Sequence, residues 1–218
     1  MFLLFVLALA VFVIYRIFCT LPNRNNAVKR SKTKSLAVFL GSGGHTSEAL
    51  TLISALDFNR YSPRTYVISE GDSFSAQKAQ ELESSKETNA CPAQYMILTI
   101  PRARRVHQPL VTTPPTALYS LLLCIYHLTV APFRQSSSFA DVLILNGPGT
   151  CFVLCIAVYV NKFLGLAAPR VIYIESFARV ESLSLSGKLL YPFVDRFIVQ
   201  WPQLQTKAKG AEFHGLLV

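Results

Sequence analysis

Residues 36–48, LAVFLGSGGHTSE, constrain the fold more than any other stretch of this chain. An apolar run breaks at Gly41 and gives way to a helical pattern, which predicts a strand, a tight turn and a helix N-terminus. Glycines let the backbone approach a ligand closely, and the first free N–H groups of a helix favour an anion. We therefore predict a phosphate cradle; a ligand-free packed turn is the alternative. Its members are Gly41, Ser42, Gly43, Gly44, His45 and Thr46.

Composition narrows the class of protein. With 218 residues the chain fits one large domain plus an accessory segment and excludes two full domains. Hydrophobic residues make up 51% and mean hydropathy is +0.37, so some apolar stretches are expected to meet lipid. The net charge of +9 points to an anionic partner: nucleic acid, a membrane surface or a phosphorylated substrate.

The five cysteines are odd in number and lack CxxC spacing, which favours a reducing compartment. Cys151 and Cys155 share one face of a predicted apolar helix, where small buried side chains are expected rather than a zinc site or disulfide. No metal site and no cofactor are predicted.

The N-terminal segment is apolar and is followed by positive charge. Residues 1–15 carry no charge, and the apolar pattern continues past Arg16 to Cys19, so we predict a transmembrane anchor over 1–20. The positive-inside rule then makes 21–34 a basic cytosolic linker and places the remaining chain in the cytosol. The alternative is a helix that lies along the membrane or packs into a partner. The linker charges are Arg24, Lys29, Arg30, Lys32 and Lys34.

From residue 35 onward, strand-like runs alternate with helical ones, and this order predicts an α/β fold with a Rossmann-like, doubly wound parallel sheet over 35–218. The expected strands are 36–40, 65–69, 95–100, 141–145, 170–175 and 196–200, and the expected helices are 46–56, 73–85, 117–130, 150–164 and 183–190.

Polar clusters follow four of these strands, where ligands bind to open sheets of this kind. They are 41–46, 101–105, 146–150 and 175–179. Glycine turns supply backbone donors, arginines supply charge, and His45 and Glu175 can accept a proton. Together they predict a site for a ligand that carries phosphates. The members outside the first turn are Arg102, Arg104, Arg105, Asn146, Gly147, Gly149, Thr150, Ser176 and Arg179.

Each cluster also has a plainer interpretation. The arginines could belong to a solvated loop, residues 146–149 could form a simple turn, and Glu175 could cap a helix or complete an ion pair. The helix over 117–133 is apolar nearly all round, so it is either buried against the sheet or rests partly in the membrane. A second span is rejected, because it would put the loops after strands one and four on opposite sides of the bilayer.

Several blocks carry a family resemblance: GSGGHTSE, YSPRTYVI, IPRARRV, NGPGTC, YIESFARVESLSLSGK and DRFIVQWPQL. From Ser35 to the last residue the chain resembles the membrane-anchoring subunit of the two-subunit UDP-N-acetylglucosamine transferase of N-glycan precursor assembly. In outline it is similar to the N-terminal half of the bacterial enzyme that adds N-acetylglucosamine to the lipid-linked peptidoglycan precursor. The resemblance implies the acceptor-side half of a GT-B glycosyltransferase, and the chain ends without a second α/β domain for the donor.

The implied reaction transfers N-acetylglucosamine from UDP to dolichyl-diphosphate N-acetylglucosamine, with inversion, at the cytosolic face of the endoplasmic reticulum or nuclear envelope. A separate UDP-N-acetylglucosamine-binding catalytic subunit would be the partner, nucleic acid would not, and the chain alone would be inactive. His45 would be general base or diphosphate ligand, and Glu175 the second candidate base or a sugar ligand. The glycine turns with Arg102 and Arg104 would hold the diphosphate, and Ser176 and Arg179 the acceptor sugar or the domain interface. The closing residues implied in partner docking are Leu216, Leu217 and Val218.

The chain departs from the family pattern at Arg105, Pro109 and Val153, which puts the role of the loop after strand three in doubt. Two rival functions remain open. A nicotinamide-dependent oxidoreductase is suggested by Gly41 and Gly43 after strand one and Glu70 after strand two, although Thr46 replaces the third glycine. The other rival is a scaffold that only recruits a complete enzyme.

Overall fold

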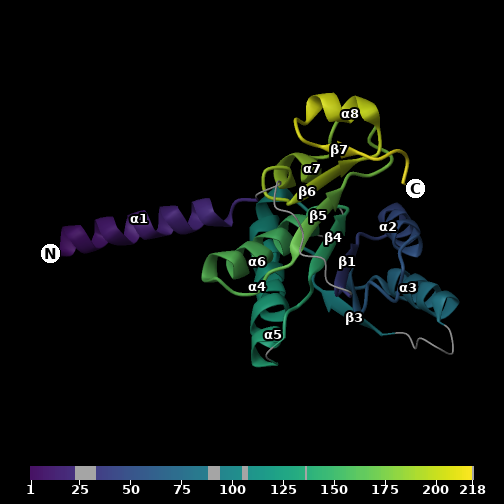
Figure 1. Cartoon of the computed structure of the whole chain (residues 1–218), viewed down its shortest axis with the longest axis horizontal. Helices are drawn as coiled ribbons and strands as arrows, with labels where there is room; N and C mark the ends of the chain where they lie inside the picture. Colours follow the sequence, from purple (N-terminus) through teal and green to yellow (C-terminus); the bar gives the residue numbers. More distant parts are fainter. Residues whose placement is uncertain (23–32, 88–93, 105–107, 136, 218) are drawn as a thin grey trace.

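A computed structural model describes residues 1–22, 33–87, 94–104, 108–135 and 137–217. Its centre is one parallel sheet with the strand order β3-β2-β1-β4-β5-β6-β7 (Figure 1). Successive strands run outward from β1 in one direction and from β4 in the other, so the sheet is doubly wound as predicted. The strands are β1 (Leu36–Leu40), β2 (Arg64–Ser69), β3 (Tyr95–Ile100), β4 (Val142–Asn146), β5 (Arg170–Ile174), β6 (Arg196–Val199) and β7 (Glu212–Phe213).

Helices cover both faces of the sheet (Figure 1). On one face α2 (Gly44–Ser54) packs on β1 and β4, and α3 (Ser73–Lys86) packs on β2. On the other, α4 (Thr113–Ile125) and α6 (Thr150–Leu164) pack against each other. The short helices are the 3-10 turn η1 (Leu110–Thr112), the π-helical turn η2 (Tyr126–Val130), α5 (Ala131–Arg134), α7 (Leu185–Leu190) and α8 (Pro202–Lys207).

The sheet divides the hydrophobic core into two clusters, one on each of its faces. In β1, Ala37 and Phe39 belong to a cluster with α4 and α6, whereas Leu36, Val38 and Leu40 belong to a cluster with α2. This alternation follows from the two-residue period of a strand, and every residue of β1 is buried. A strand buried on both faces reads as a continuous apolar run, which is why the sequence pattern identified it.

Most expected elements appear within a few residues of their predicted bounds. The helix expected over 117–130 is longer, because α4, η2 and α5 form a continuous helical segment over 113–134. Two elements near the C-terminus, α8 and β7, were not predicted, because six and two residues are too short for a periodic signal.

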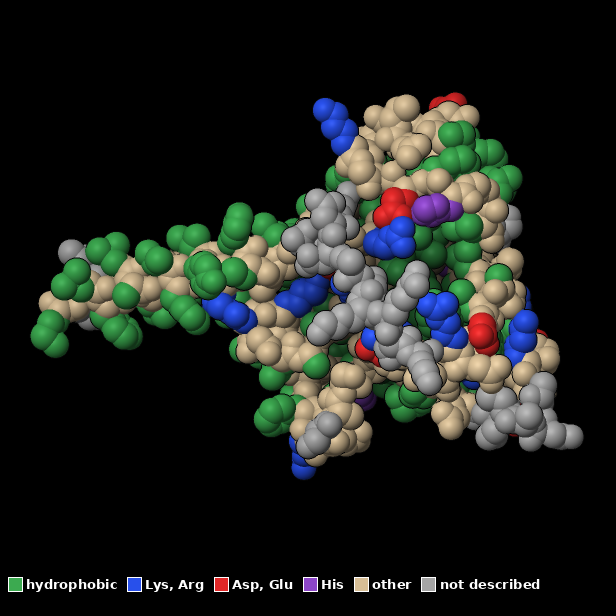
Figure 2. All heavy atoms as spheres, in the orientation of Figure 1, with side chains coloured by type: hydrophobic (Ala, Val, Ile, Leu, Met, Phe, Trp, Pro, Cys, Tyr) green, Lys and Arg blue, Asp and Glu red, His purple; other side chains and the backbone are tan. Residues whose placement is uncertain are grey.

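The helix α1 (Phe2–Thr20) extends away from the sheet, and apolar side chains cover it along its length (Figures 1 and 2). At its inner end Arg16 Nε donates to the carbonyl of Phe163 and Nη2 to that of Lys162, both at 3.0 Å, in the last turn of α6. The predicted anchor is therefore a helix fastened to the domain through a cation at a helix C-terminus. Whether it crosses a membrane stays a prediction, and most of the predicted linker, 23–32, lies outside the described residues.

Among the described residues, one helical stretch, Thr113–Arg134, is long and apolar enough to cross a membrane, whereas Leu4–Thr20 and Thr150–Leu164 are shorter apolar helices. The stretch Thr113–Arg134 packs on the domain through one side, where Cys124 and Leu128 are buried in the core. That it does not span stays a prediction.

Candidate functional site

The predicted site lies where β1 and β4 meet. These two strands pair directly, with Leu40 opposite Asn146, so the turns that follow them are neighbours. The chain leaves β1 toward one end of the sheet and β4 toward the other, which makes this the switch point where open α/β sheets bind ligands.

Two glycines hold the two turns together. A Cβ on Gly41 would lie 2.9 Å from the carbonyl oxygen of Asn146 and 2.9 Å from the His45 Cβ. A Cβ on Gly147, whose φ is +140°, would lie 3.2 Å from the Gly41 Cα. Glycine is therefore required at both positions for backbone-to-backbone packing rather than for contact with a ligand.

Three other glycines face open space. A Cβ on Gly43, Gly44 or Gly149 would meet nothing within 4 Å among the described residues. Gly43 is the N-cap of α2 with φ +56°, and Gly149 is the N-cap of α6. The N-termini of both helices thus lie at one rim, where the positive ends of two helix dipoles can attract an anion.

A chain of hydrogen bonds links His45 to the neighbouring strands. His45 Nδ1 lies 2.9 Å from Asn146 Oδ1, and Asn146 Nδ2 donates to Glu48 Oε2 at 3.0 Å and to the Ile174 carbonyl at 3.4 Å. Glu48 Oε1 accepts from the Ser176 hydroxyl at 2.9 Å. Residues from α2, β4 and the loop after β5 therefore form one network.

The network fixes the tautomer of the neutral His45 imidazole. The amide NH₂ of Asn146 must face the Glu48 carboxylate and a carbonyl, since the reverse orientation would put its oxygen against two acceptors. Its oxygen then faces His45, so Nδ1 carries the proton and donates. In the neutral imidazole the lone pair then lies on Nε2, which suits that atom to accept a proton from a bound hydroxyl.

Glu48 was not among the predicted site residues. It lies three positions after His45, and residues at that spacing share one face of a helix. The pattern H-x-x-E at the start of a helix that follows a glycine turn was the signal that could have identified it.

The hydroxyl of Ser42 is paired within the protein. It donates to Asp72, a residue just before α3 that was not among the predicted site residues, and Arg102 Nη2 lies 3.4 Å from the Ser42 Oγ. Asp72 also accepts from the Ser75 hydroxyl at 2.7 Å and the Ser75 amide at 3.2 Å. Burial alone would raise the pKa of the Asp72 carboxyl, but these bonds and the nearby Arg102 charge lower it below its ordinary value.

The loop after β3 bends back to the same rim. Ala103 donates its amide to Thr150 Oγ1 at 3.3 Å, which brings this loop to the first turn of α6 although β3 is the far edge strand. Arg102 is half-buried beside Ser42, whereas Arg104 is exposed and donates to the Gln108 carbonyl at 2.9 Å. Arg105 lies outside the described residues.

Thr46 and Asn146 are fully buried, which favours positioning roles for both. The Thr46 hydroxyl pairs with Ser75 Oγ at 2.6 Å and its amide donates to the Gly43 carbonyl at 3.1 Å, so neither group faces a ligand. Asn146 uses both ends of its amide within the network. The predicted diphosphate ligands that keep open geometry are Gly43, Gly44, Gly149 and Arg102.

Glu175 follows β5 at the rim, but its carboxylate is fully buried. Oε1 accepts from the Ser176 amide at 3.1 Å, and Oε2 accepts from the Ser184 amide at 2.9 Å and its hydroxyl at 3.1 Å. A Cβ on Gly187 would lie only 2.2 Å from Oε2. The bonds of Glu175 favour a role in holding the loop between β5 and α7 rather than in proton transfer. Gly187 is needed because a side chain there would displace the Glu175 carboxylate.

The remaining predicted residues lie farther along the rim. Ser176 belongs to the Glu48 network, while Arg179 is exposed on the loop after it. Near the C-terminus Leu216 is exposed and the Leu217 amide donates to Gln200 Oε1 at 3.2 Å, which places this segment beside the end of β6. Val218 lies outside the described residues. In the part of the chain that the structure describes, no group of three or more metal-ligating side chains occurs.

Comparison with known proteins places the chain in a family. The family model described as "Oligosaccharide biosynthesis protein Alg14 like" matches residues 36–217. A Schizosaccharomyces pombe protein named UDP-N-acetylglucosamine transferase subunit alg14 is 49% identical over 196 residues, covering 88% of this chain and 89% of its own. A Cryptococcus neoformans protein named as the ALG14 subunit is 48% identical over 186 residues, covering 84% and 80%. The human protein of that name is 39% identical over 216 residues, covering 97% and 94%.

Among solved structures, Arabidopsis thaliana UGT89C1 complexed with quercetin aligns with 85% of this chain and 49% of its own, at 14% identity and a TM-score of 0.45. That likeness is too distant to carry an argument. The family match spans nearly all of the α/β domain and agrees with the resemblance found in the sequence. This chain belongs to the Alg14 family of oligosaccharide biosynthesis proteins.

Proposed function

We propose that this chain is the membrane-anchoring, acceptor-binding subunit of a UDP-N-acetylglucosamine transferase. Its acceptor would be dolichyl-diphosphate N-acetylglucosamine at the cytosolic face of the endoplasmic reticulum. The relatives' printed names support a transferase subunit. The observation that carries the proposal is the contact between the Gly41 and Gly147 turns, which brings two helix N-termini and an oriented His45 to one rim.

The acceptor's diphosphate would bind across the two helix N-termini. An added Cβ on Gly43, Gly44 or Gly149 would meet nothing within 4 Å among the described residues, so phosphate oxygens can approach the backbone there, and the Arg102 guanidinium can supply positive charge. The buried pairing of Ser42 with Asp72 turns the Asp72 carboxylate toward hydrogen-bond donors, which limits its repulsion of the phosphates.

His45 would act as general base. Its Nε2 takes the proton of the attacking acceptor hydroxyl while the new bond to the sugar forms and the bond to UDP breaks, so UDP leaves with the electron pair. Asn146 and Glu48 would act as positioning residues, because they fix the tautomer and the ring orientation. Glu175 would hold the β5–α7 loop beside this site.

A second subunit would bring UDP-N-acetylglucosamine to the open rim, since the sheet described above has a single switch point and we assign it to the acceptor. The exposed Leu216 and the segment around Leu217 would form part of the docking surface. The apolar helix α1 would hold the rim beside the bilayer that contains the lipid acceptor.

The direct test is a transfer assay in proteoliposomes with UDP-N-acetylglucosamine and the lipid acceptor. Transfer is expected only when this chain and a UDP-sugar-binding subunit are both present. Robust transfer by this chain alone would contradict the half-enzyme proposal. Binding of NAD or NADP in a thermal-shift titration would favour the oxidoreductase instead.

Substitution of His45 distinguishes a subunit that contributes to the active site from a scaffold that only recruits an enzyme. His45→Ala in the assembled pair is expected to lower turnover by about 10²- to 10⁴-fold, the usual contribution of a general base, while co-purification of the partner is kept. The matched control is Ser47→Ala on the exposed side of the same helix turn, with unchanged turnover. Unchanged turnover for His45→Ala would assign this chain a recruiting role only.

A further inference from the structure

An unusual apolar surface lies on the continuous helix formed by α4, η2 and α5. Between residues 113 and 133 this helix carries no Asp, Glu, Lys or Arg. One row of side chains at four-residue spacing, Ser120, Cys124, Leu128 and Pro132, is buried against the domain. A second row, offset by two residues, faces outward and is exposed: Leu118, Leu122, Tyr126 and Val130. We call this second row, together with Phe133, the outer α4 face.

The π-helical turn helps each row to stay on one side of the helix along its length. Four-residue spacing drifts by about 40° per step in a regular α-helix of 3.6 residues per turn, so a straight row would wind around the helix. The wider turn at η2 (Tyr126–Val130) offsets part of that drift. Leu128 and Pro132 consequently remain buried in line with Cys124, while Val130 and Phe133 remain outside, the latter 71% exposed.

Positive charge flanks the outer α4 face at both ends. Arg134 is exposed at the end of α5, and Arg104 is exposed on the loop that precedes η1. An uncharged apolar helix face between basic residues is complementary to a bilayer surface that carries phosphate headgroups.

The orientation of the helix agrees with a bilayer surface. In Figure 1, α4 and α5 run across the direction of α1, and both α1 and α4 contact α6. If α1 descends into the bilayer along its normal, the α4–α5 helix lies parallel to the membrane plane. The two helices would then contact one membrane in two ways, one inserted and one lying on it.

The same helix is tied to the predicted phosphate site. Ser120 Oγ donates to the Pro101 carbonyl at 2.7 Å, and Thr116 Oγ1 donates to the Ala103 carbonyl at 3.0 Å. The loop thus held carries Arg102, beside the open glycines. A bilayer seated on the outer α4 face would bring lipid phosphates to the level of that loop.

We infer that the outer α4 face lies in the headgroup and acyl-chain boundary of the membrane, as a second contact in addition to α1. This inference rests on the proposed membrane anchoring. It gives the domain a second contact with the bilayer, in addition to the α1 helix that Arg16 fastens to α6.

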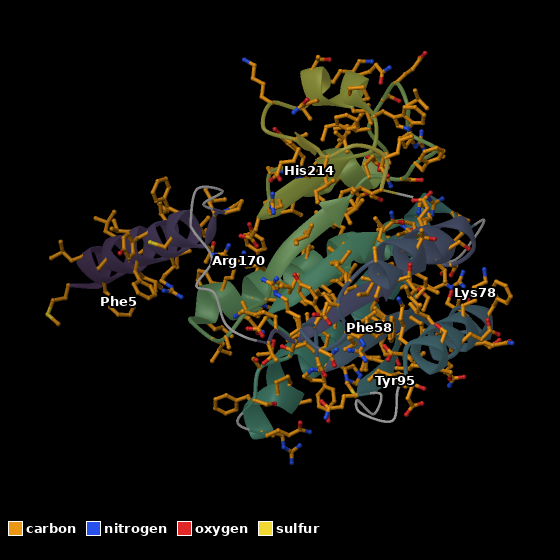
Figure 3. All side chains as sticks on the ribbon, turned by 45° about the vertical axis from the view of Figure 1, so that its right-hand side comes forward. Phe5, Phe58, Lys78, Tyr95, Arg170 and His214 are labelled. Carbon is orange, nitrogen blue, oxygen red and sulfur yellow. The ribbon has the colours of Figure 1, made fainter. Side chains whose placement is uncertain are left out.

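The test uses the full chain in vesicles of phosphatidylcholine with a minor share of phosphatidylserine, and measures quenching of tryptophan by brominated lipids. Three matched Phe→Trp variants are made in a Trp201→Phe background, which removes the only native tryptophan. Phe5→Trp reports on α1, Phe133→Trp on the outer α4 face, and Phe74→Trp on α3, which covers the other face of the sheet. All three native side chains are more than half exposed; Figure 3 labels Phe5, on the projecting helix.

Because an interfacial helix buries its apolar face about 5–10 Å into the headgroup and acyl boundary, emission of Phe133→Trp is expected to fall roughly twofold with lipids brominated high on the acyl chain. Phe5→Trp is expected to be quenched and Phe74→Trp is not. Quenching of Phe5→Trp but not Phe133→Trp would overturn the inference and keep the anchor. Quenching of Phe133→Trp alone would support the inference and contradict the anchor, and no quenching at either position would overturn both.

Two further measurements address the folding of the Trp201→Phe background and the depth of the helix in the bilayer. The same substitutions in the chain that keeps Trp201 give the change relative to the unsubstituted protein, so the result does not depend on how Trp201→Phe folds. Stronger quenching of Phe133→Trp by lipids brominated near the bilayer midplane than near the headgroups would mean deep insertion and would also overturn the surface position.

Discussion

Two polar networks of this domain use the same chemistry in opposite ways. Around β2 and α3, Arg64 donates to both carboxylate oxygens of Glu83, at 2.6 and 2.8 Å, and the Tyr66 hydroxyl donates to one of them at 2.7 Å. Arg64 also donates to the Phe58 carbonyl at 2.9 Å and lies over the Phe58 ring. Its side chain is 4% exposed and that of Glu83 1%.

At the rim, Glu48 and Asn146 are also connected side chain to side chain, but the chain of bonds ends at His45, which is half-buried. The network around Glu83 points back into the fold, so it can only stabilise. The rim network leaves an imidazole nitrogen at the carboxyl edge of the sheet, beside open helix N-termini. The comparison teaches that place in the sheet, more than residue type, separates a structural network from a candidate site.

Glu83→Ala should give the largest effect on stability. It removes the carboxylate that pairs with both sides of the buried Arg64 guanidinium, and removal of one partner of a buried pair costs about 3–5 kcal/mol. Chemical unfolding in detergent measures this loss, with Glu81→Ala on the exposed side of α3 as the control. Transfer by the molecules that remain folded should be unchanged; a specific loss of turnover would break the comparison.

Gly187→Ala tests whether Glu175 has a structural role, like Glu83, rather than a role in the site. The new Cβ would lie 2.2 Å from Glu175 Oε2, so the β5–α7 loop must shift, and overpacking of this kind costs about 1–3 kcal/mol. The melting temperature should fall more for Gly187→Ala than for Gly149→Ala, because a Cβ on Gly149 meets open space among the described residues. Equal stability of the two variants would contradict the packed position of Glu175.

Glu48→Gln sharpens the assignment of the rim network. A neutral amide at this position holds Asn146 and Ser176 less well, so the imidazole is misplaced and turnover should fall by about 10- to 100-fold. Stability should change little, because the group lies at the rim. Steady-state kinetics of the assembled pair should show the loss in kcat with KM nearly unchanged, and Glu48→Ala should be worse than Glu48→Gln. A loss of stability without a loss of kcat would show that Glu48 has a structural role and does not position His45.

Asp72 should give the smallest effect, visible only as a dependence on pH. Hydrogen bonds from Ser42 and Ser75 lower the pKa of the Asp72 carboxyl in the folded protein. The carboxylate therefore stabilises the fold above about pH 4, the ordinary pKa of an aspartate, and this contribution is lost as the pH falls through the lowered pKa. Asp72→Asn should flatten the acid side of the stability curve slightly, compared with the exposed Asp57→Asn. An identical acid limb for wild type and Asp72→Asn would show that these bonds do not favour the charged carboxylate.

The sequence by itself determined the layers of this protein. Alternating apolar runs specify strands and helices, because the two-residue and 3.6-residue periods are local properties, and the run at 36–40 with its glycine turn identified the first strand and the rim. It also determined the family, because blocks such as GSGGHTSE and NGPGTC are distinctive as strings.

Only the tertiary structure decided what the individual groups do. His45, Glu48 and Asn146 come from a helix and a strand nearly 100 positions apart, and their pairing depends on which strands lie side by side. Burial made the same distinction between Glu175, which is enclosed, and His45, which is not. The outward direction of the α4 face likewise follows from packing on α6, because an apolar helix shows no preferred face until a neighbour covers one side.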